Sequence, residues 1–280
     1  MAILESKDIP HPAIEALFTI DEETGMTGAL NLKGGILQGQ ILLNLDTEED
    51  DEIDIGCAGG IDVTATRTYH EEEVPEGSVG YKITVKGLKG GHSGMDIHKG
   101  FGNANIIMGR ILYKALENQN VQLISIDGGS LRNAIPREGV AVVSVRNAQE
   151  FIDEVTNGLK KEILEEFATI EPNLHINIES SATSDKALSE EDSKKIILTL
   201  KSLHNGVYRM SADMEDLVET SNNIARVIIK DGEISVGCLT RSSVESSKFD
   251  LANALRSTFE LVGCEVELSG SYPGWTPNIN

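Results

Sequence analysis

Carboxylates follow two apolar segments near the start of the chain. Residues 13–20 are mostly apolar and run into the three consecutive carboxylates of residues 21–23, and residues 41–45 end at Asp46. Both segments are typical of short buried strands in a parallel sheet, so we expect carboxylates at the carboxyl end of each. Carboxylates this close repel one another unless a cation or bound protons offset their charge. The pattern suggests a metal site, and solvated turn residues are the alternative.

A second candidate is the glycine-rich segment Gly87–Gly94, which contains His92. Its glycines would let the backbone approach a ligand closely and present His92 at the mouth of a loop. The segment is not a nucleophile elbow, because G-x-S-x-G would need glycine where Met95 stands. A single histidine does not establish a site, so a structural role for His92 stays open.

Two further polar segments carry groups that suit an anionic ligand. Residues 128–136 contain Arg132 and Asn133, and Arg241 stands at the end of an apolar run just before a helical segment. An arginine binds a carboxylate through its fork of N–H groups, and a helix start offers free backbone N–H groups. Structural turns and caps are again the alternative.

Composition narrows the class of protein. The 280 residues include 45 Asp and Glu against 24 Lys and Arg, a net charge of −21. This charge repels nucleic-acid phosphates and anionic lipids, so we expect neither a nucleic-acid partner nor a membrane partner. The start of the chain lacks a signal-peptide pattern, and the three cysteines are odd in number and widely spaced. We therefore expect a cytoplasmic protein with buried, reduced thiols.

Periodicity predicts a short strand–helix–strand unit, with a helical turn at 26–32, followed by a longer α/β region. The Asp-Gly pair at 231–232 predicts a hairpin, and the polar connector 180–189 separates two αβ units. The predicted strands of the longer region are 81–85, 121–126, 140–145, 174–178, 224–229 and 233–239, and the predicted helices are 103–116, 148–167, 192–203 and 243–261.

Six motifs occur along the chain in this order: LFTIDEETGMTG (17–28), LNLDTE (43–48), GCAGG (56–60), GGHSG (90–94), GSLRNAIPR (129–137) and RSS (241–243). In their sequence and order, these motifs resemble those of the aminoacyl-histidine (Xaa-His) dipeptidases of the M20 zinc metallopeptidases. The resemblance implies an α/β fold: part of a mixed or parallel-sheet catalytic domain, with an inserted lid of two αβ sandwich units.

The resemblance also implies domain boundaries. Residues 1–60 would be a partial catalytic domain, and residues 270–280 would return into it. The lid would comprise residues 61–269, with one unit at about 61–180 and the other at about 190–269.

In the catalytic part, the resemblance assigns metal chemistry to three carboxylates. Glu22 matches the general base, which takes a proton from the metal-bridging water, and Glu23 and Asp46 match ligands of the two zinc ions. Two divalent ions would polarise the peptide carbonyl and acidify the water beside this base.

In the lid, the resemblance assigns substrate contacts to three residues. His92 would stabilise the developing oxyanion, Asn133 would contact the substrate backbone or the tetrahedral intermediate, and Arg241 would bind the free C-terminal carboxylate of a dipeptide. The expected substrate is an unblocked dipeptide with His or a similar residue second.

The chain departs from the family pattern at both ends. It lacks the H-x-D segment and the bridging Asp that precede the first strand, and the final His ligand that follows the lid. We therefore expect a fragment that lacks most zinc ligands and is inactive alone. An N-acyl amino-acid deacylase and a non-catalytic lid-type binding or dimerisation module are the alternatives, and a homodimer is possible.

Overall fold

The computed structural model describes residues 2–22, 26–45, 54–118, 121–182 and 184–277. The chain divides into two compact units, Met1–Asp54 and Ile55–Asn280, and each is described by itself. Within the described residues, no helix is both long and apolar enough to cross a membrane.

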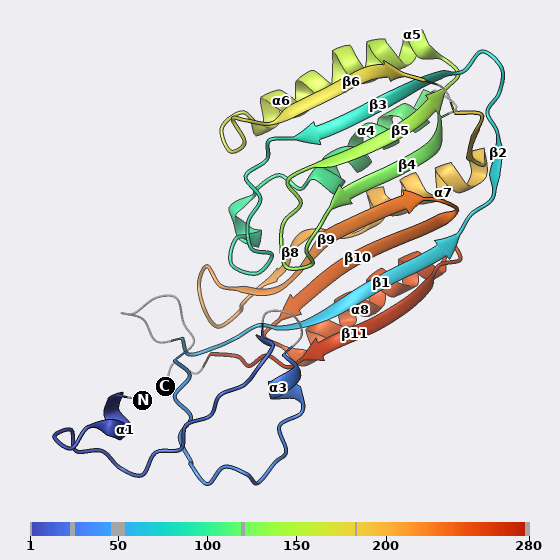
Figure 1. Ribbon diagram of the computed structural model, residues 1–280. Coiled ribbons are helices and arrows are strands. Elements are labelled where there is room, and N and C mark those ends of the chain that lie inside the picture. The colour runs from blue at the N-terminus through green and yellow to red at the C-terminus, as the bar shows by residue number, and fades with distance from the viewer. Residues whose placement is uncertain (1, 23–25, 46–53, 119–120, 183, 278–280) are drawn as a thin grey trace. The chain divides into compact units, whose positions relative to one another are not determined.

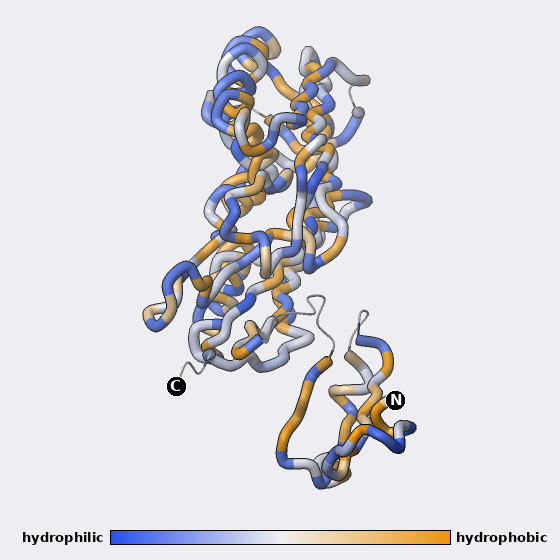
Figure 2. Tube along the Cα trace, turned by 90° about the vertical axis from the view of Figure 1, so that its left-hand side faces the viewer, coloured by the Kyte–Doolittle hydropathy of each residue, from blue (hydrophilic) through white to orange (hydrophobic). Residues whose placement is uncertain are grey.

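The first unit contains little regular structure. Its described helices are α1 (Ala2–Glu5) and α3 (Thr27–Leu30), and α3 confirms the predicted helical turn. The strands predicted at 13–20 and 41–45 are wrong, since both segments are irregular and exposed. Figure 2 accordingly colours long exposed stretches of this unit as apolar. A strand forms only where a neighbour binds its backbone N–H and C=O groups, and no described strand pairs with either segment.

The second unit is built on a nine-stranded sheet in which every neighbouring pair is antiparallel (Figure 1). The order is β11-β1-β10-β9-β4-β5-β3-β6, and β8 pairs with β9. A separate ribbon pairs β2 (Glu71–Glu73) with β7 (Lys186–Leu188). The strands of the large sheet are β1 (Gly59–Thr68), β3 (Val79–Lys86), β4 (Val121–Gly129), β5 (Gly139–Val145), β6 (His175–Ser181), β8 (Gly206–Met210), β9 (Val218–Lys230), β10 (Glu233–Ser242) and β11 (Glu265–Tyr272).

Helices cover one face of this sheet, the face turned away from the viewer in Figure 1. Helix α4 packs on the strands β3, β4 and β5, and α8 packs on β1, β10 and β11. The helices of this unit are η1 (Ile97–Lys99), α4 (Ala104–Asn118), α5 (Ala148–Phe151), the π-helix η2 (Ile152–Leu159), α6 (Lys160–Phe167), α7 (Glu190–Ser202) and α8 (Glu245–Glu260).

The core lies between the sheet and these helices, because apolar residues recur with the period of each element. Along β5 the buried side chains include Ala141, Val143 and Val145, at every second position. Along α4 they recur every three or four residues, which gives the helix one apolar face. The buried side chains of α4 are Ala104, Asn105, Ile107, Met108, Ile111, Leu112 and Ala115.

The sheet consists of two halves with the same topology. One half has the order β4-β5-β3-β6 and the other has the order β9-β10-β1-β11, and they join where β4 pairs with β9. In each half the chain runs strand, helix, hairpin, helix, strand. The α/β lid of two units is therefore confirmed. Strand β1 belongs to the second half, although it precedes the whole first half in the sequence. The domain boundaries given above stay a prediction.

Most predicted elements of this unit are confirmed. The predicted helix at 148–167 corresponds to the continuous helical run α5–η2–α6, and the Asp-Gly turn joins β9 to β10, with Asp231 at φ 54° and Gly232 at φ 84°. The strands that periodicity did not predict are β1, β2, β7, β8 and β11. The two halves meet closely: at Gly129, φ 75°, a Cβ would lie 1.9 Å from the carbonyl oxygen of Ala225 on β9.

We expect Gly129→Ala to destabilise the second unit by about 2 kcal/mol or more, because it adds left-handed strain and a backbone clash at the junction. Gly232→Ala is the matched control. Gly232 has φ 84° and open space around its would-be Cβ, so this variant tests strain alone and should cost about 1 kcal/mol. Urea unfolding followed by circular dichroism measures both. Equal losses in the two variants would contradict a tight β4–β9 junction.

Candidate functional site

Three of the predicted site residues meet at one edge of the sheet. Because neighbouring strands alternate in direction, β3, β4 and β10 all end at the same edge, as their arrowheads show in Figure 1. His92 follows β3, Asn133 follows β4 and Arg241 lies near the end of β10. We call the loop 87–103 the histidine loop and residues 130–136 the asparagine loop.

Backbone hydrogen bonds join the two loops. Ser93 N–H donates to the carbonyl of Asn133 over 2.8 Å, and Ile135 N–H donates to the carbonyl of Gly91 over 2.8 Å. Arg241 Nε donates to Ser93 Oγ over 3.4 Å. The backbones that carry His92 and Asn133 therefore lie side by side, with the guanidinium of Arg241 beside them.

A buried glutamate holds both ends of the histidine loop. Glu171 is 2% exposed, and its carboxylate accepts the N–H of Lys89 over 2.8 Å and the N–H of Gly102 over 2.9 Å. It lies between α6 and β6, far from the loop in the sequence. A carboxylate that accepts two backbone N–H groups satisfies donors that burial would otherwise leave unpaired.

The asparagine loop is held from below by β9. The side-chain amide of Asn223, which is fully buried, donates to the carbonyls of Arg132 and Ala134, on either side of Asn133. The Asn133 side chain itself is exposed. Arg132 reaches across to β1, where it pairs with Asp62 over 3.0 Å and donates to Thr64.

Arg241 is half-buried and bonds to the end of β11. Its Nη1 donates to the hydroxyl of Tyr272 over 2.8 Å. The Tyr272 carbonyl in turn accepts the ammonium of Lys248, a fully buried side chain of α8, over 2.7 Å. Beyond Tyr272, the N–H of Trp275 donates to the carbonyl of Cys57 over 2.8 Å. The segments that precede β1 and follow β11 thus run side by side near Arg241.

The predicted metal residues belong to the first part of the chain, and the cluster around His92 belongs to the second unit. Glu22 lies in the first unit and is exposed, and Glu23 and Asp46 fall outside the described residues. Among the residues that are described, no group of three or more His, Cys, Asp or Glu side chains could hold a metal ion. The zinc ligands that the family resemblance implies, Glu23 and Asp46, are not among those residues, so a metal site stays a prediction.

The cysteines are thiols in two environments. Cys238 is fully buried, and burial raises the pKa of its thiol to about 12. Burial also raises the pKa of Cys264. Cys57 is exposed, so the expectation that all three are buried is wrong for Cys57. It lies in the bridge to Trp275, just before β1.

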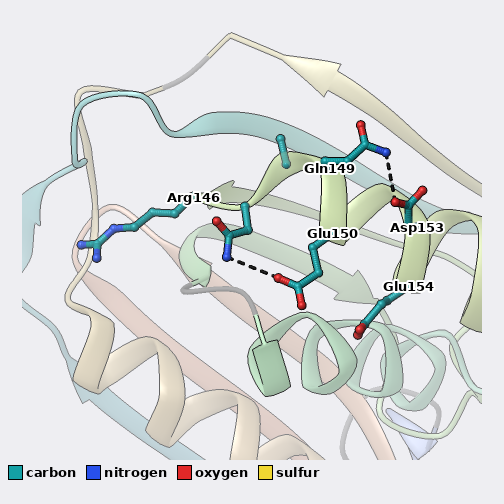
Figure 3. Close-up of a pocket in the computed structure, with 7 residues that line it drawn as sticks. Arg146, Gln149, Glu150, Asp153 and Glu154 are labelled. Carbon is teal, nitrogen blue, oxygen red and sulfur yellow. Dashed lines mark hydrogen bonds between the residues drawn. The ribbon is translucent and has the colours of Figure 1, made fainter.

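A separate open hollow lies at the start of α5 (Figure 3). Its polar side chains pair with one another: Asn147 with Glu150, and Gln149 with Asp153. Arg146 points away from these acids in Figure 3 and binds Glu190. This hollow shares no residue with the cluster around His92.

Sequence reasoning missed the residues that position the site, namely Glu171, Asn223, Tyr272 and Lys248. One signal was available: the run Glu219–Asn223 is polar within a strand whose other residues are mostly apolar, and all five of its residues are buried. A buried polar run in a central strand indicates bonded partners.

We expect Glu171→Ala to destabilise the second unit by about 3 kcal/mol, because two backbone N–H groups lose their acceptor. Glu171→Gln keeps one acceptor and should lose about half as much. Glu166→Ala is the control: Glu166 is a carboxylate of the neighbouring helix, half-exposed and paired with Arg110, and should cost less than about 1 kcal/mol. Urea unfolding measures all three. A loss for Glu171→Ala no larger than that for Glu166→Ala would show that the two hydrogen bonds of Glu171 contribute little to stability.

The chain is similar to known peptidases. Residues 76–172, which span β3 to α6, match the peptidase dimerisation domain of the M20 peptidases. The chain is 40% identical over its full length to the cytosol non-specific dipeptidase of Escherichia coli (strain K12), of which it spans 58%.

A solved structure gives the same result. The crystal structure of aminoacylhistidine dipeptidase from Vibrio alginolyticus matches 99% of this chain with a TM-score of 0.88 and 42% identity. The chain spans 57% of that protein. This chain is therefore similar over its whole length to part of the aminoacyl-histidine dipeptidases, and its residues 76–172 match the dimerisation domain of M20 peptidases.

Proposed function

We propose that this chain serves in a cytoplasmic, zinc-dependent dipeptidase that hydrolyses unblocked Xaa-His dipeptides. The observation that carries the proposal is the meeting of His92, Asn133 and Arg241 at one sheet edge, in a chain 40% identical to a dipeptidase. The dimerisation domain supports a homodimer, and the cytosolic name of the Escherichia coli relative supports the location.

The partners of Arg241 support its role as the group that binds the substrate carboxylate. Within the described residues its side chain bonds to two neutral hydroxyls, those of Ser93 and Tyr272. Other arginines of this acidic chain pair with carboxylates: Arg67, Arg110, Arg132, Arg146 and Arg226. Because hydroxyl oxygens do not neutralise a guanidinium, its positive charge can still attract an anionic ligand.

His92 and Asn133 lie where they could act on the rest of the dipeptide. Once the carboxylate binds Arg241, the peptide carbonyl would lie within reach of a ring N–H of His92, which stabilises negative charge on that oxygen. The exposed amide of Asn133 would bind the substrate backbone. Glu22 as general base, and Glu23 and Asp46 as zinc ligands, complete the proposal from the family resemblance. The zinc ions would supply an acidified water and polarise the carbonyl.

The proposed function predicts activity for the complete polypeptide encoded by the gene and none for the 280-residue chain. Both are assayed on Xaa-His dipeptides with Zn²⁺, and on dipeptides with other second residues to measure the preference. Loss of activity after chelation and recovery with Zn²⁺ are expected. Turnover of N-acyl amino acids instead of dipeptides would favour a deacylase, and an inactive, dimeric complete polypeptide would favour a dimerisation module.

Arg241→Ala should raise KM for a free dipeptide roughly 30- to 150-fold, since a charge-assisted hydrogen bond worth about 2–3 kcal/mol is lost. Zinc content should not change. The matched substrate is the same dipeptide with an amidated C-terminus, whose KM should respond little because it has no carboxylate to bind. An equal rise in KM for both substrates would overturn the assignment of Arg241.

A further inference from the structure

The histidine loop contains a tight turn closed by one carboxylate. Asp96 N–H donates to the carbonyl of His92 over 3.0 Å, and Asp96 Oδ2 accepts the N–H of His92 over 2.7 Å. The backbone and side chain of Asp96 therefore bind the two polar backbone groups of the same residue. This double contact fixes the turn from His92 to Asp96 at both ends.

Within this turn the His92 ring faces its own backbone. The N–H groups of Gly94 and Met95 lie 3.2 Å and 3.1 Å from His92 Nδ1 and donate to it. A backbone N–H can only donate, so Nδ1 must be the unprotonated, accepting nitrogen. A neutral imidazole carries one ring proton, which then sits on Nε2.

We propose that Asp96 is a positioning residue that holds His92 as the Nε2–H tautomer, so that Nε2–H is the donor His92 presents to a ligand oxygen. The use of that donor on a peptide carbonyl rests on the proposed function. The tautomer is inferred from the two hydrogen bonds to Nδ1, independently of any substrate.

Two features fit Asp96 to this role. Lys99 Nζ donates to Asp96 Oδ1 over 2.7 Å, and Asp96 Oδ2 accepts the N–H of His92. The hydrogen bonds from Lys99 and from the His92 N–H lower the pKa of the Asp96 carboxyl group. At Gly91, φ 148°, a Cβ would lie 2.7 Å from Asp96 Oδ2. Only glycine at position 91 admits the carboxylate this close.

The turn also places the ring next to Arg241. A Cβ on Gly94 would lie 3.2 Å from His92 Cε1 and 3.3 Å from Arg241 Cδ, so both side chains pack against Gly94. Among the described residues, the charged groups next to this turn include Asp96, Lys99 and Arg241. A ligand bound by Arg241 would therefore lie within reach of the His92 ring.

The test is nuclear magnetic resonance of the 280-residue chain without substrate or metal, with the ring of His92 assigned by His92→Gln. The ring nitrogen shifts should show the proton on Nε2, and scalar coupling across the hydrogen bonds should link Nδ1 to the amides of Gly94 and Met95. A proton on Nδ1 in the unaltered chain would overturn the proposal, whatever the enzyme assay gives.

Variants test Asp96 itself. Asp96→Ala should speed amide hydrogen exchange at His92, Gly94 and Met95 roughly tenfold and move the ring nitrogen shifts toward those of free histidine, because the turn loses its acceptor. Asp96→Asn keeps an acceptor oxygen and should restore most of the protection. Lys99→Ala, which leaves Asp96 in place, is the control. A folded Asp96→Ala chain with unchanged ring shifts and exchange would show that Asp96 does not position His92.

Discussion

The candidate site depends on one pairing, that of β4 with β9. Within each half of the sheet the strands pair with one another, but His92 and Asn133 belong to one half and Arg241 belongs to the other. The antiparallel register that sets Gly129 opposite Arg226 fixes how far the ends of β4 and β10 extend at the shared edge. A shift of one residue would turn the side chains of β9 to the opposite face and remove Asn223 from beneath the asparagine loop.

Buried polar side chains fix the conformation of the two loops at this edge. Glu171 and Asn223 each bind two backbone groups of a loop that crosses the sheet edge. A buried polar side chain is costly unless its hydrogen bonds are made, so each of these residues stabilises only one arrangement of its loop. Apolar residues of the same size would fill the space without selecting a loop conformation.

The sequence predicted the lid well and the first unit poorly, for a physical reason. Helix 148–167 and the hairpin at Asp231-Gly232 follow from local periodicity and turn chemistry, which the chain carries by itself. The apolar segments 13–20 and 41–45 have strand composition, yet strands require partners, and none pairs with them in the described part. Motifs located His92, Asn133 and Arg241, whereas Glu171 and Asn223 act through contacts between distant segments that periodicity does not reveal.

Charge explains why the site needs these neutral supports. In a chain of net charge −21, carboxylates are abundant, and a carboxylate beside Arg241 would compete with any anionic ligand for the same N–H groups. Hydroxyls of Ser93 and Tyr272 orient the guanidinium without neutralising it. The nearby carboxylate of Asp96 is directed instead to the backbone of His92 and to Lys99. This edge therefore holds an oriented cation and an oriented ring within a strongly acidic molecule, which is the combination that the proposed binding of a dipeptide carboxylate needs.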